Sequence, residues 1–335
     1  MRLSKLGEFG LIKKLQKKIP AISPDVITGI GDDAAAIKVP KSRILVTSDM
    51  LIEGVHFDLS FTTFYQLGHK FLAVNISDIL AMGGEPKYFL VSIGIPEKCD
   101  SENINELYSG ISAIARKFGI SIIGGDTCAS KNGLILNGTL IGNVKHRTIN
   151  RSGAKAGDGI FITDTAGDSA MGLFLLLNLK QKIKRCESEK AGIKFQGISL
   201  ECRNVLSLVK KHLMPQPVHL KNTHRVTSMI DISDGLLADL GHICDESRTG
   251  AVIYKEKIPL SGELLSVAKK LGRDPLDFAL KGGEDYILLF TAPVSYRTNA
   301  YRIGEIIKKG RYIIDSNGRK SRFKAEGYEH FKNSE

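Results

Sequence analysis

The segment Ser228–Tyr254 reads SMIDISDGLLADLGHICDESRTGAVIY, and its hydrophobic period changes twice. The short apolar run over 228–232 predicts a strand, and residues 235–246 repeat apolar side chains at helical spacing. The β-branched run over 251–254 predicts a second strand after a turn. A strand, a helix and a strand in succession are typical of proteins that mix both kinds of element.

The rest of the chain shows the same uneven alternation on both sides of a turn-rich stretch, Gly153–Asp158. We therefore expect an α+β protein with two sheets: an α/β N-terminal domain over 1–148 and an α+β C-terminal domain over 149–335. Further strands are predicted over 43–50, 89–95, 120–123, 133–144, 159–163 and 286–292, and further helices over 1–18, 71–82, 104–118, 169–179, 200–212 and 261–271.

Composition limits the class of protein. The 335 residues are 42% hydrophobic and 25% charged, which is typical of a globular chain of about two domains. The longest apolar run, 171–177, is too short to cross a bilayer, and the N-terminus does not resemble a signal peptide, so we expect a cytoplasmic protein. The net charge of +11 is concentrated in Lys180–Lys194 and Arg302–Lys324, which we interpret as solvated faces. The five cysteines include no Cys-x-x-Cys pair that would indicate a zinc site.

Acidic residues recur in one local pattern, at Gly-rich turns or strand ends. Adjacent carboxylates repel one another, and burying them without a partner costs several kcal/mol, so the repetition calls for cations. Oxygen ligands without His or Cys clusters favour Mg²⁺, which shares its coordination sphere with phosphate oxygens. The pattern occurs at Gly29–Asp33 (GIGDD), Val46–Asp49 (VTSD), Gly124–Thr127 (GGDT), Asp231–Gly235 (DISDG) and Gly282–Asp285 (GGED).

Two further observations support a site that binds cations together with phosphate. In the predicted helix 71–82, Asn75 and Asp78 share a face beside an apolar stripe, and an acid in such surroundings is costly unless something binds it. Arg151 opens the second half of the chain and is a candidate phosphate clamp. Each feature alone is equally compatible with a capped turn or a solvated surface, and the hypothesis depends on their number.

Several nucleotide and hydrolase signatures are missing. The sequence contains neither Gly-x-x-x-x-Gly-Lys-Ser/Thr nor the catalytic-loop and Asp-Phe-Gly signatures of protein kinases. It also lacks the Gly-x-Ser-x-Gly elbow of many hydrolases. These absences exclude a P-loop NTPase, a protein-kinase fold and the common α/β-hydrolase.

Taken together, the motifs resemble those of thiamine-monophosphate kinases, in the expected order from Gly7 to Phe331. Three departures stand out: Cys128-Ala129-Ser130 replaces the family's Thr-Arg-Gly, Val218 replaces the Arg of Pro-x-Pro-Arg, and Lys180–Gln196 is longer and more basic. The matching stretches are GIGDDA (29–34), TSDMLIEGVHF (47–57), LAVNISDILAMG (72–83), GGDT (124–127), NRSGAKAGD (150–158), GDSAMG (167–172), DISDGLLADLGH (231–242), GGEDY (282–286) and GYEHF (327–331).

This resemblance implies an aminoimidazole-ribonucleotide-synthetase-like, two-domain architecture, with an N-terminal ATP/Mg-binding and dimerisation domain and a C-terminal domain that completes the nucleotide and substrate site. It also implies the reaction of ATP with thiamine phosphate to give thiamine diphosphate and ADP, the final step of thiamine diphosphate synthesis, in a homodimer without nucleic-acid or membrane partners. By matching position, Asp33, Thr47, Ser48, Asp49, Asp78, Asp126, Asp231 and Asp234 would hold Mg²⁺; Gly125, Asp126, Arg151 and Ser233 would contact ATP, the co-substrate; His56, Glu284 and Tyr328 would contact thiamine phosphate; and Asp49, Asp126, Arg151 and Asp234 would be catalytic.

The chemistry agrees with the residues. A phosphate monoester has a second pKa of about 6, so the nucleophile is mostly ionised at pH 7 and needs no general base. The barrier is repulsion between two polyanions, which positioning and charge neutralisation lower. We therefore expect direct in-line transfer at a site rich in Asp, and we expect the scattered acids to converge in space.

Other interpretations remain open. A selenophosphate synthetase would carry a reactive Cys in an N-terminal loop, whereas no cysteine precedes Cys99; the hydrogenase-maturation relative would end in a cysteine, and the purine-pathway synthetase would contain Gly-x-Gly-Thr-Lys. A basic protein could instead bind nucleic acid through Lys180–Lys194, although no recognition motif supports this. The third alternative is an inactive homologue that still binds ATP.

Overall fold

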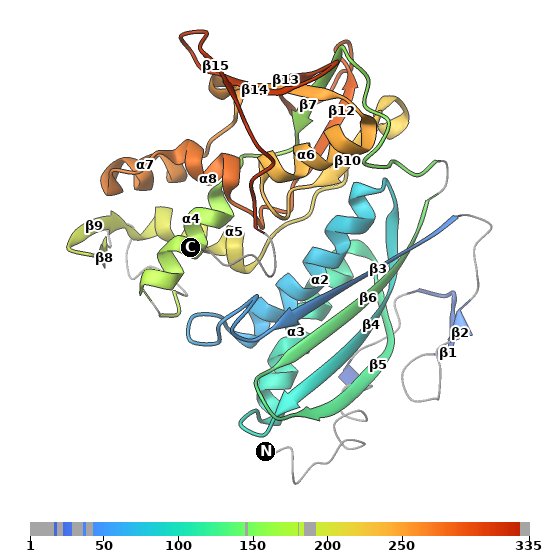
Figure 1. Cartoon of the computed structure of the whole chain (residues 1–335). Helices are drawn as coiled ribbons and strands as arrows, with labels where there is room; N and C mark the ends of the chain where they lie inside the picture. Colours follow the sequence, from blue (N-terminus) through green and yellow to red (C-terminus); the bar gives the residue numbers. More distant parts are fainter. Residues whose placement is uncertain are drawn as a thin grey trace. The chain divides into compact units, whose positions relative to one another are not determined.

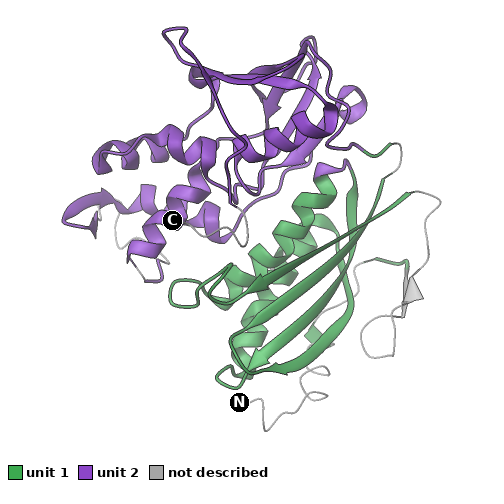
Figure 2. Cartoon of the chain, viewed as in Figure 1, with its two compact units in different colours: residues 1–80, 84–148 green, residues 81–83, 149–335 purple. Residues whose placement is uncertain are grey.

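The computed structural model describes residues 17–18, 23–28, 36–37, 43–144, 147–179, 181–183 and 192–328. The chain forms two compact units, one comprising residues 1–80 and 84–148 and the other residues 81–83 and 149–335 (Figure 2). Apart from residues 17–18, which are helical, the predicted helix 1–18 lies outside the described residues, as does the motif 29–34.

Unit 1 is built on a four-stranded sheet with two helices against one face (Figure 1). The strand order is β3-β6-β4-β5; β4 and β5 pair in parallel and the other pairs are antiparallel. The elements are β3 (Arg43–Ile52), α2 (Phe64–Ala81), β4 (Glu85–Pro96), α3 (Ser101–Phe118), β5 (Ser121–Ser130) and β6 (Ile135–Val144), and the short strands β1 (Val26–Thr28) and β2 (Ala36–Ile37) pair separately.

Close backbone approach holds the helices of unit 1 together. A Cβ at Gly68 of α2 would lie 1.9 Å from the carbonyl oxygen of Leu107 on α3, and a Cβ at Gly110 would lie 2.0 Å from that of Tyr65. Only glycine permits such contact between two helices. Phe71 of α2 then packs edge-on against Phe89 of β4, with ring centroids 5.4 Å apart, and joins the helix layer to the sheet.

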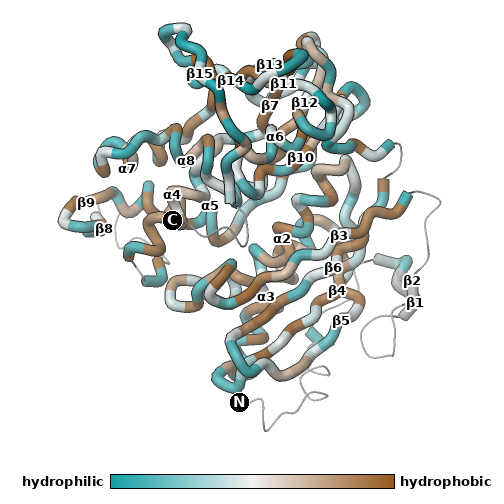
Figure 3. Tube along the Cα trace, in the orientation of Figure 1, coloured by the Kyte–Doolittle hydropathy of each residue, from teal (hydrophilic) through white to brown (hydrophobic). Residues whose placement is uncertain are grey.

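The opposite face of this sheet carries exposed apolar side chains. Along β3 the side chains alternate, so that Leu45 and Leu51 are buried whereas Ile44, Val46 and Met50 are 47%, 65% and 49% exposed. Hydrophobic segments run along β3, β6 and β4 in Figure 3. An apolar sheet face of this kind marks an interaction surface.

Unit 2 contains a seven-stranded mixed sheet of order β10-β12-β7-β13-β11-β14-β15, in which only β11 and β14 pair in parallel. The strands β8 and β9 pair with each other in a separate two-stranded hairpin. The strands are β7 (Asp158–Ile162), β8 (Gly192–Phe195), β9 (Ile198–Glu201), β10 (Ser228–Asp231), β11 (Gly250–Tyr254), β12 (Leu288–Pro293), β13 (Tyr301–Ile307), β14 (Arg311–Ile314) and β15 (Lys320–Arg322).

Helices complete the core of unit 2. Leu236, Leu240 and Ile243 of α6 are fully buried and belong to one apolar cluster with the sheet residues Ile253 and Leu289. The helices are α4 (Asp168–Leu179), α5 (Cys202–Leu213), α6 (Leu236–Ser247), α7 (Gly262–Leu271) and α8 (Pro275–Lys281), with short 3₁₀ turns η1 (Thr223–Arg225) and η2 (Lys255–Lys257).

The α+β class with two main sheets is confirmed. The predicted strand 228–232 is β10, the predicted helix 235–246 is α6, and the predicted strand 251–254 lies within β11. Two expectations are wrong. Asp49 lies inside β3 rather than at its end, and the motif 124–127 lies inside β5 rather than after a strand, because pairing carries β3 on to Ile52 and β5 on to Ser130. Among the described helices, none is long and apolar enough to span a membrane.

Gly125 should be needed for the pairing of β4 with β5. Its φ is +151°, and an added Cβ would lie 1.8 Å from the carbonyl oxygen of Val91. We expect Gly125→Ala to lower the free energy of unfolding by about 3 kcal/mol or more, because backbone must move. Gly119→Ala is the matched control: φ is +66° there but no atom lies within 4 Å of the added Cβ, so about 1 kcal/mol is expected. Equal costs in urea unfolding would contradict this prediction.

Candidate active site

The first group of predicted site residues lies on β3 and α2 of unit 1. Thr47 and Asp49 share the face of β3 that carries buried Leu45, and both are half-buried. The hydroxyl of Thr47 donates a hydrogen bond to Oδ2 of Asp78, which reaches the strand from α2. This part of the fold therefore presents hydroxyl and carboxylate oxygens from two elements, the donor types that Mg²⁺ prefers.

Ser48 lies on the other face of β3. Its Oγ is 3.3 Å from Oγ1 of Thr139 and accepts a 3.3 Å hydrogen bond from the side-chain amide of Asn137, both on the neighbouring strand β6. Consecutive side chains of a strand point to opposite faces, so the hydroxyls of Thr47 and Ser48 cannot serve the same side of the sheet. The family resemblance had implied that both are metal ligands.

The polar pair predicted on helix 71–82 is not a solvated face. Asn75 is fully buried, and its side-chain amide donates to the carbonyl of Phe71 at 3.0 Å, one turn earlier. Asp78 is half-buried beside Thr47. The acid is thus enclosed by the fold on the side of α2 that faces the sheet.

Gly125 and Asp126 lie on β5, and the central strands β6 and β4 separate them from β3. Val91 of β4 pairs with Gly125 in the parallel ladder, and the next pair along it includes Asp126. Asp126 is exposed, and its Oδ1 accepts the N–H of Thr127 at 2.9 Å. Its carboxylate is available at the surface of this edge of the sheet.

His56 follows β3 in the connection to α2. Its Nδ1 accepts the backbone N–H of Ile52 at 3.1 Å, and its ring is half-buried. A neutral imidazole that accepts at Nδ1 carries its proton on Nε2, so the second nitrogen is a donor. Such a donor suits an anionic or carbonyl-bearing ligand.

The second group of predicted residues forms one assembly in unit 2. Asp231 is the buried last residue of β10, and Ser233 and Asp234 follow in the loop to α6. The N–H of Glu284 donates to the carbonyl of Ser233 at 2.8 Å, and that of Tyr328 donates to the carbonyl of Asp234 at 3.0 Å. The structure therefore brings two other segments, which carry residues predicted to contact thiamine phosphate, against the loop whose residues are predicted to contact metal and ATP.

Glycine and unusual backbone angles make this assembly possible. A Cβ at Gly283 would lie 2.3 Å from the carbonyl oxygen of Ser233, and one at Gly327 would lie 2.5 Å from that of Asp234. Glu284 and Tyr286 have φ of +64° and +50°, which is uncommon for residues other than glycine. Such strain persists only where the surrounding contacts impose it, and it concentrates at functional sites.

Arg151 is exposed at the start of unit 2. Its carbonyl accepts the hydroxyl of Ser247 at 3.3 Å, and the carbonyl of Asn150 beside it accepts the N–H of Met229 at 3.0 Å. The backbone is therefore tied to β10 and to the end of α6. A guanidinium on an anchored backbone fits the clamp role expected from the sequence.

Sequence reasoning missed Asp239, which lies within the quoted motif 231–242. Its Oδ2 accepts the N–H groups of Ser233, Asp234 and Gly235 at 3.1, 3.3 and 3.1 Å. Burial raises the pKa of Asp239 to about 8; the carboxylates of Asp231 and Asp234 also raise it, and the N–H groups lower it. The helical pattern placed this residue on α6 but gave no signal that its side chain turns back to the loop.

Asp285 and His212 are two further residues that the sequence did not single out. Asp285 accepts the N–H groups of Gly167 and Ser169 at 2.7 and 3.1 Å, at the beginning of α4. His212 is buried on α5, with Nδ1 3.2 Å from Oγ of Ser169 and 3.4 Å from Oε2 of Glu284. The Glu284 segment is thereby tied to both α4 and α5.

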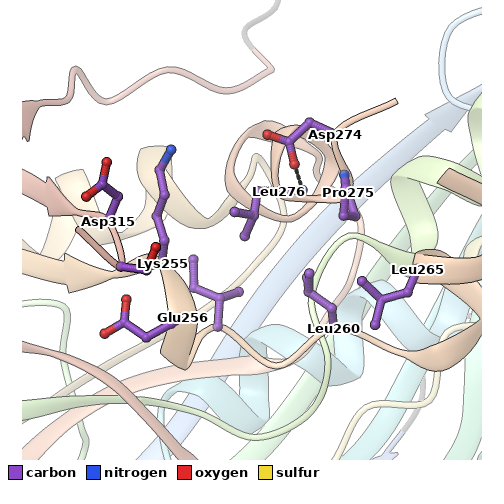
Figure 4. Close-up of a pocket in the computed structure, with 10 residues that line it drawn as sticks. Lys255, Glu256, Leu260, Leu265, Asp274, Pro275, Leu276 and Asp315 are labelled. Carbon is purple, nitrogen blue, oxygen red and sulfur yellow. Dashed lines mark hydrogen bonds between the residues drawn. The ribbon is translucent and has the colours of Figure 1, made fainter. Parts of the chain in front are cut away.

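A cavity of about 460 Å³ elsewhere in unit 2 is not part of this assembly (Figure 4). Leu260, Leu265 and Leu276 contribute to its apolar wall, and the carboxylates of Asp274 and Asp315 already accept backbone N–H groups. None of the predicted site residues lines it. We therefore base the candidate site on the loop assembly and on the acids of unit 1.

Comparison with known proteins places this chain in a family. Residues 31–144 match the family described as AIR synthase related protein, N-terminal domain. The thiamine-monophosphate kinase of Aquifex aeolicus is 34% identical over 338 residues, covering 99% of this chain and all of the relative. That of Buchnera aphidicola subsp. Acyrthosiphon pisum is 37% identical over 349 residues, covering 98% and 99%.

The chain belongs to the thiamine-monophosphate kinase family. Solved structures agree with this membership. The thiamine-monophosphate kinase of Stenotrophomonas maltophilia K279a superposes with a TM-score of 0.77 at 31% identity and covers 92% of this chain and 95% of its own. The structure of AaThiL complexed with AMPPCP and TMP has a TM-score of 0.74 at 33% identity and covers 99% of both chains.

Membership of the thiamine-monophosphate kinase family confirms the resemblance and the expected architecture. The hydrogenase maturation protein HypE also shares the fold, with a TM-score of 0.66, but at 17% identity this likeness concerns the fold alone. Asp33, the remaining predicted metal ligand, lies outside the described residues, as does its neighbour Asp32.

Asp285 should make the stability of this thiamine-monophosphate kinase family member depend on pH. Burial raises the pKa of Asp285 to about 7 in the fold, whereas an unfolded Asp titrates near 3.9. The folded state therefore binds this proton more tightly, so the stabilisation is complete below about pH 4 and is lost as pH rises through 7.

Asp285→Asn removes this titration, so we expect its melting temperature to fall less between pH 5 and pH 8 than that of the wild type. Differential scanning calorimetry at both pH values measures the two slopes. Parallel slopes would show that the Asp285 carboxyl does not titrate in this interval.

Proposed function

We propose that this protein catalyses ATP-dependent phosphorylation of thiamine phosphate to thiamine diphosphate, the final step of thiamine diphosphate synthesis, by direct in-line transfer with Mg²⁺. The observation that carries the proposal is near full-length likeness to thiamine-monophosphate kinases, combined with the loop assembly of Ser233, Asp234, Glu284 and Tyr328. The structure of a relative with the same architecture is described as a complex with AMPPCP and TMP. In a thiamine-monophosphate kinase these correspond to an ATP analogue and to thiamine phosphate.

The residues fit Mg²⁺ by their chemistry. The carboxylates of Asp231 and Asp234 both raise the pKa of Asp239, so the two proposed ligands lie near one another and near a third acid, a gathering of carboxyl groups that a divalent cation relieves. When bound, Mg²⁺ would neutralise negative charge on the phosphate oxygens. The proposed ligands are Asp33, Thr47, Asp49, Asp78 and Asp126 in unit 1 and Asp231 and Asp234 in unit 2. Ser48, which the resemblance also implies, is left out because its hydroxyl lies on the opposite face of β3 from that of Thr47.

The remaining roles divide between nucleotide and acceptor. Gly125, Asp126, Arg151 and Ser233 would contact ATP, since a glycine backbone and a guanidinium suit phosphate oxygens. Thiamine phosphate carries a cationic ring system and an anionic phosphate. The carboxylate of Glu284 suits the cation, the Nε2–H of His56 suits an oxygen acceptor, and Tyr328 offers an exposed ring for stacking; these three are the proposed acceptor-binding residues.

Catalysis in this proposal needs no side-chain base. The attacking oxygen belongs to a phosphate monoester that is mostly ionised at pH 7, so the protein's task is to hold two anions in line. Asp49, Asp126 and Asp234 would hold the cations in place, and Arg151 would donate to the oxygens of the phosphoryl group in transfer.

We also propose that the N-terminal domain, 1–148, contributes ATP and Mg²⁺ binding and dimerisation, and that the domain 149–335 completes the nucleotide and substrate site. The helix-free face of the unit 1 sheet supports a homodimer, because Ile44, Val46 and Met50 expose apolar surface there. A cytoplasmic location, which suits an enzyme that uses ATP, stays a prediction from the sequence.

Removal of a single acid should abolish most activity without unfolding the protein. We expect Asp49→Asn and Asp126→Asn to lower kcat for thiamine diphosphate formation by about 100-fold or more, because metal sites lose function when a ligand changes. Asp58→Asn, an exposed turn residue of the same unit, is the control. Chelation of Mg²⁺ should have the same effect on the wild type and be reversed by added Mg²⁺. Full activity in both site variants would show that these acids are not in the active site.

The apolar sheet face can be tested independently of activity. Val46→Asp places a charge on the exposed face of β3 and should convert a dimer into monomers, as light scattering after gel filtration would show. Val55, 54% exposed in the loop after β3, offers the matched control Val55→Asp, which should remain dimeric. A Val46→Asp protein that elutes as a dimer would exclude this face as the interface.

A further inference from the structure

The backbone of the loop between β10 and α6 is hydrogen-bonded on both sides. Its N–H groups donate to one carboxylate, and its carbonyls accept N–H groups from other segments. Oδ2 of Asp239 accepts three consecutive N–H groups, those of residues 233, 234 and 235. On the carbonyl side, Ile232 accepts the N–H of Tyr286 at 2.9 Å, and the next two carbonyls accept the N–H groups of Glu284 and Tyr328. Every residue from 232 to 234 therefore has its carbonyl engaged by one of two distant segments.

Asp239 accepts the N–H groups at the start of α6 that an N-cap side chain would otherwise accept. The N-terminal residues of a helix leave N–H groups without intrahelical partners, and an N-cap side chain normally accepts one of them. Here the N-cap is Gly235, with φ of +130° and no side chain to accept a bond. Asp239 reaches back from inside the helix instead, and its side-chain oxygen takes the place of the missing N-cap acceptor.

We propose that Asp239 is a positioning residue for the phosphoryl-transfer site: its carboxylate fixes the backbone of 233–235 and thereby sets the places of Ser233, Asp234, Glu284 and Tyr328 together. The inference rests on the proposed function and adds a residue with no direct contact to either substrate. Because Asp239 is 1% exposed and its Oδ2 already accepts three N–H groups, it acts on the loop rather than on a reagent.

The geometry predicts a graded series of variants. Asp239→Ala removes all three acceptor contacts, whereas Asp239→Asn keeps one neutral oxygen at nearly the same place. A displacement of about 1 Å in a catalytic group can cost about 100-fold. We therefore expect kcat/KM for ATP and for thiamine phosphate to fall together, by about 100-fold in Asp239→Ala and by about 10-fold in Asp239→Asn.

Asp315→Ala is the matched control in the same unit. The carboxylate of Asp315 accepts the N–H groups of Asn317 and Arg319, both at 2.9 Å, in the turn between β14 and β15. This variant also loses a carboxylate that holds a turn, but that turn, 315–319, is not part of the loop 233–235 that Asp239 holds. All proteins are assayed well below their own melting temperatures, and Asp315→Ala should keep the wild-type kinetic constants.

Amide hydrogen exchange tests the mechanism without any substrate. In Asp239→Ala the peptide covering 231–236 should exchange faster than in the wild type, and peptides around 284–286 and 328 should follow, while the sheet of unit 1 stays unchanged. Asp315→Ala should leave these peptides unchanged.

Unchanged exchange in 231–236 would overturn the inference, whatever the activity. So would faster exchange with wild-type kinetic constants, since the loop would then be mobile without consequence. A wild-type protein that forms no thiamine diphosphate would contradict the proposed function itself, and the exchange data would still decide whether Asp239 holds the loop.

Discussion

Negative charge held out of water is the constraint around which this structure is organised. A carboxylate that loses water must be compensated by N–H donors or by cations, and the cost of leaving it bare is several kcal/mol. Unit 2 uses backbone donors: the side chains of Asp239 and Asp285 each accept consecutive or nearly consecutive N–H groups at the start of a helix. In unit 1 a hydroxyl meets the carboxylate of Asp78. A loop whose backbone is held in this way is suited to the proposed phosphoryl transfer, because little reorganisation is left at the moment of reaction.

The same constraint explains why glycine recurs beside the acids. Backbone N–H groups can compensate a carboxylate only if the backbone itself comes close, and a Cβ at Gly125 or Gly283 would occupy the space of a neighbouring carbonyl oxygen. In each Gly-Asp or Gly-Glu pair of the sequence, the two residues therefore act together. Glycine admits the neighbouring backbone, and the acid that follows takes a position defined by that contact.

The sequence predicted the class of the fold and much of the candidate site because both depend on short-range patterns. The helical period around Asp78 and the strand that ends at Asp231 are local signals, and both residues lie where those signals placed them. The exposed position of Asp126 inside β5 was not predictable in the same way, since strand length is decided by pairing with β4. Similarly, the hydroxyl of Ser48 follows the face of β3, which depends on which side of the sheet the helices cover.

Asp239 illustrates the remaining limit of prediction from sequence, since a helix period cannot reveal a side chain that folds back onto the preceding loop. The α8 segment and the strands β14 and β15 were missed for a related reason: short elements are stabilised by their neighbours more than by their own pattern.

The positive φ of Glu284 has a consequence for how this protein responds to selection. A residue with a Cβ is disfavoured at φ of +64°, and Gly or Asn would relieve that backbone energy while deleting the carboxylate. A mutant library screened only for heat resistance would therefore enrich those two amino acids at position 284. A screen for growth that requires thiamine diphosphate, the product of the proposed reaction, would retain the acid. The two screens would diverge at this codon, and the divergence would measure how much folding free energy the chain forgoes for its chemistry.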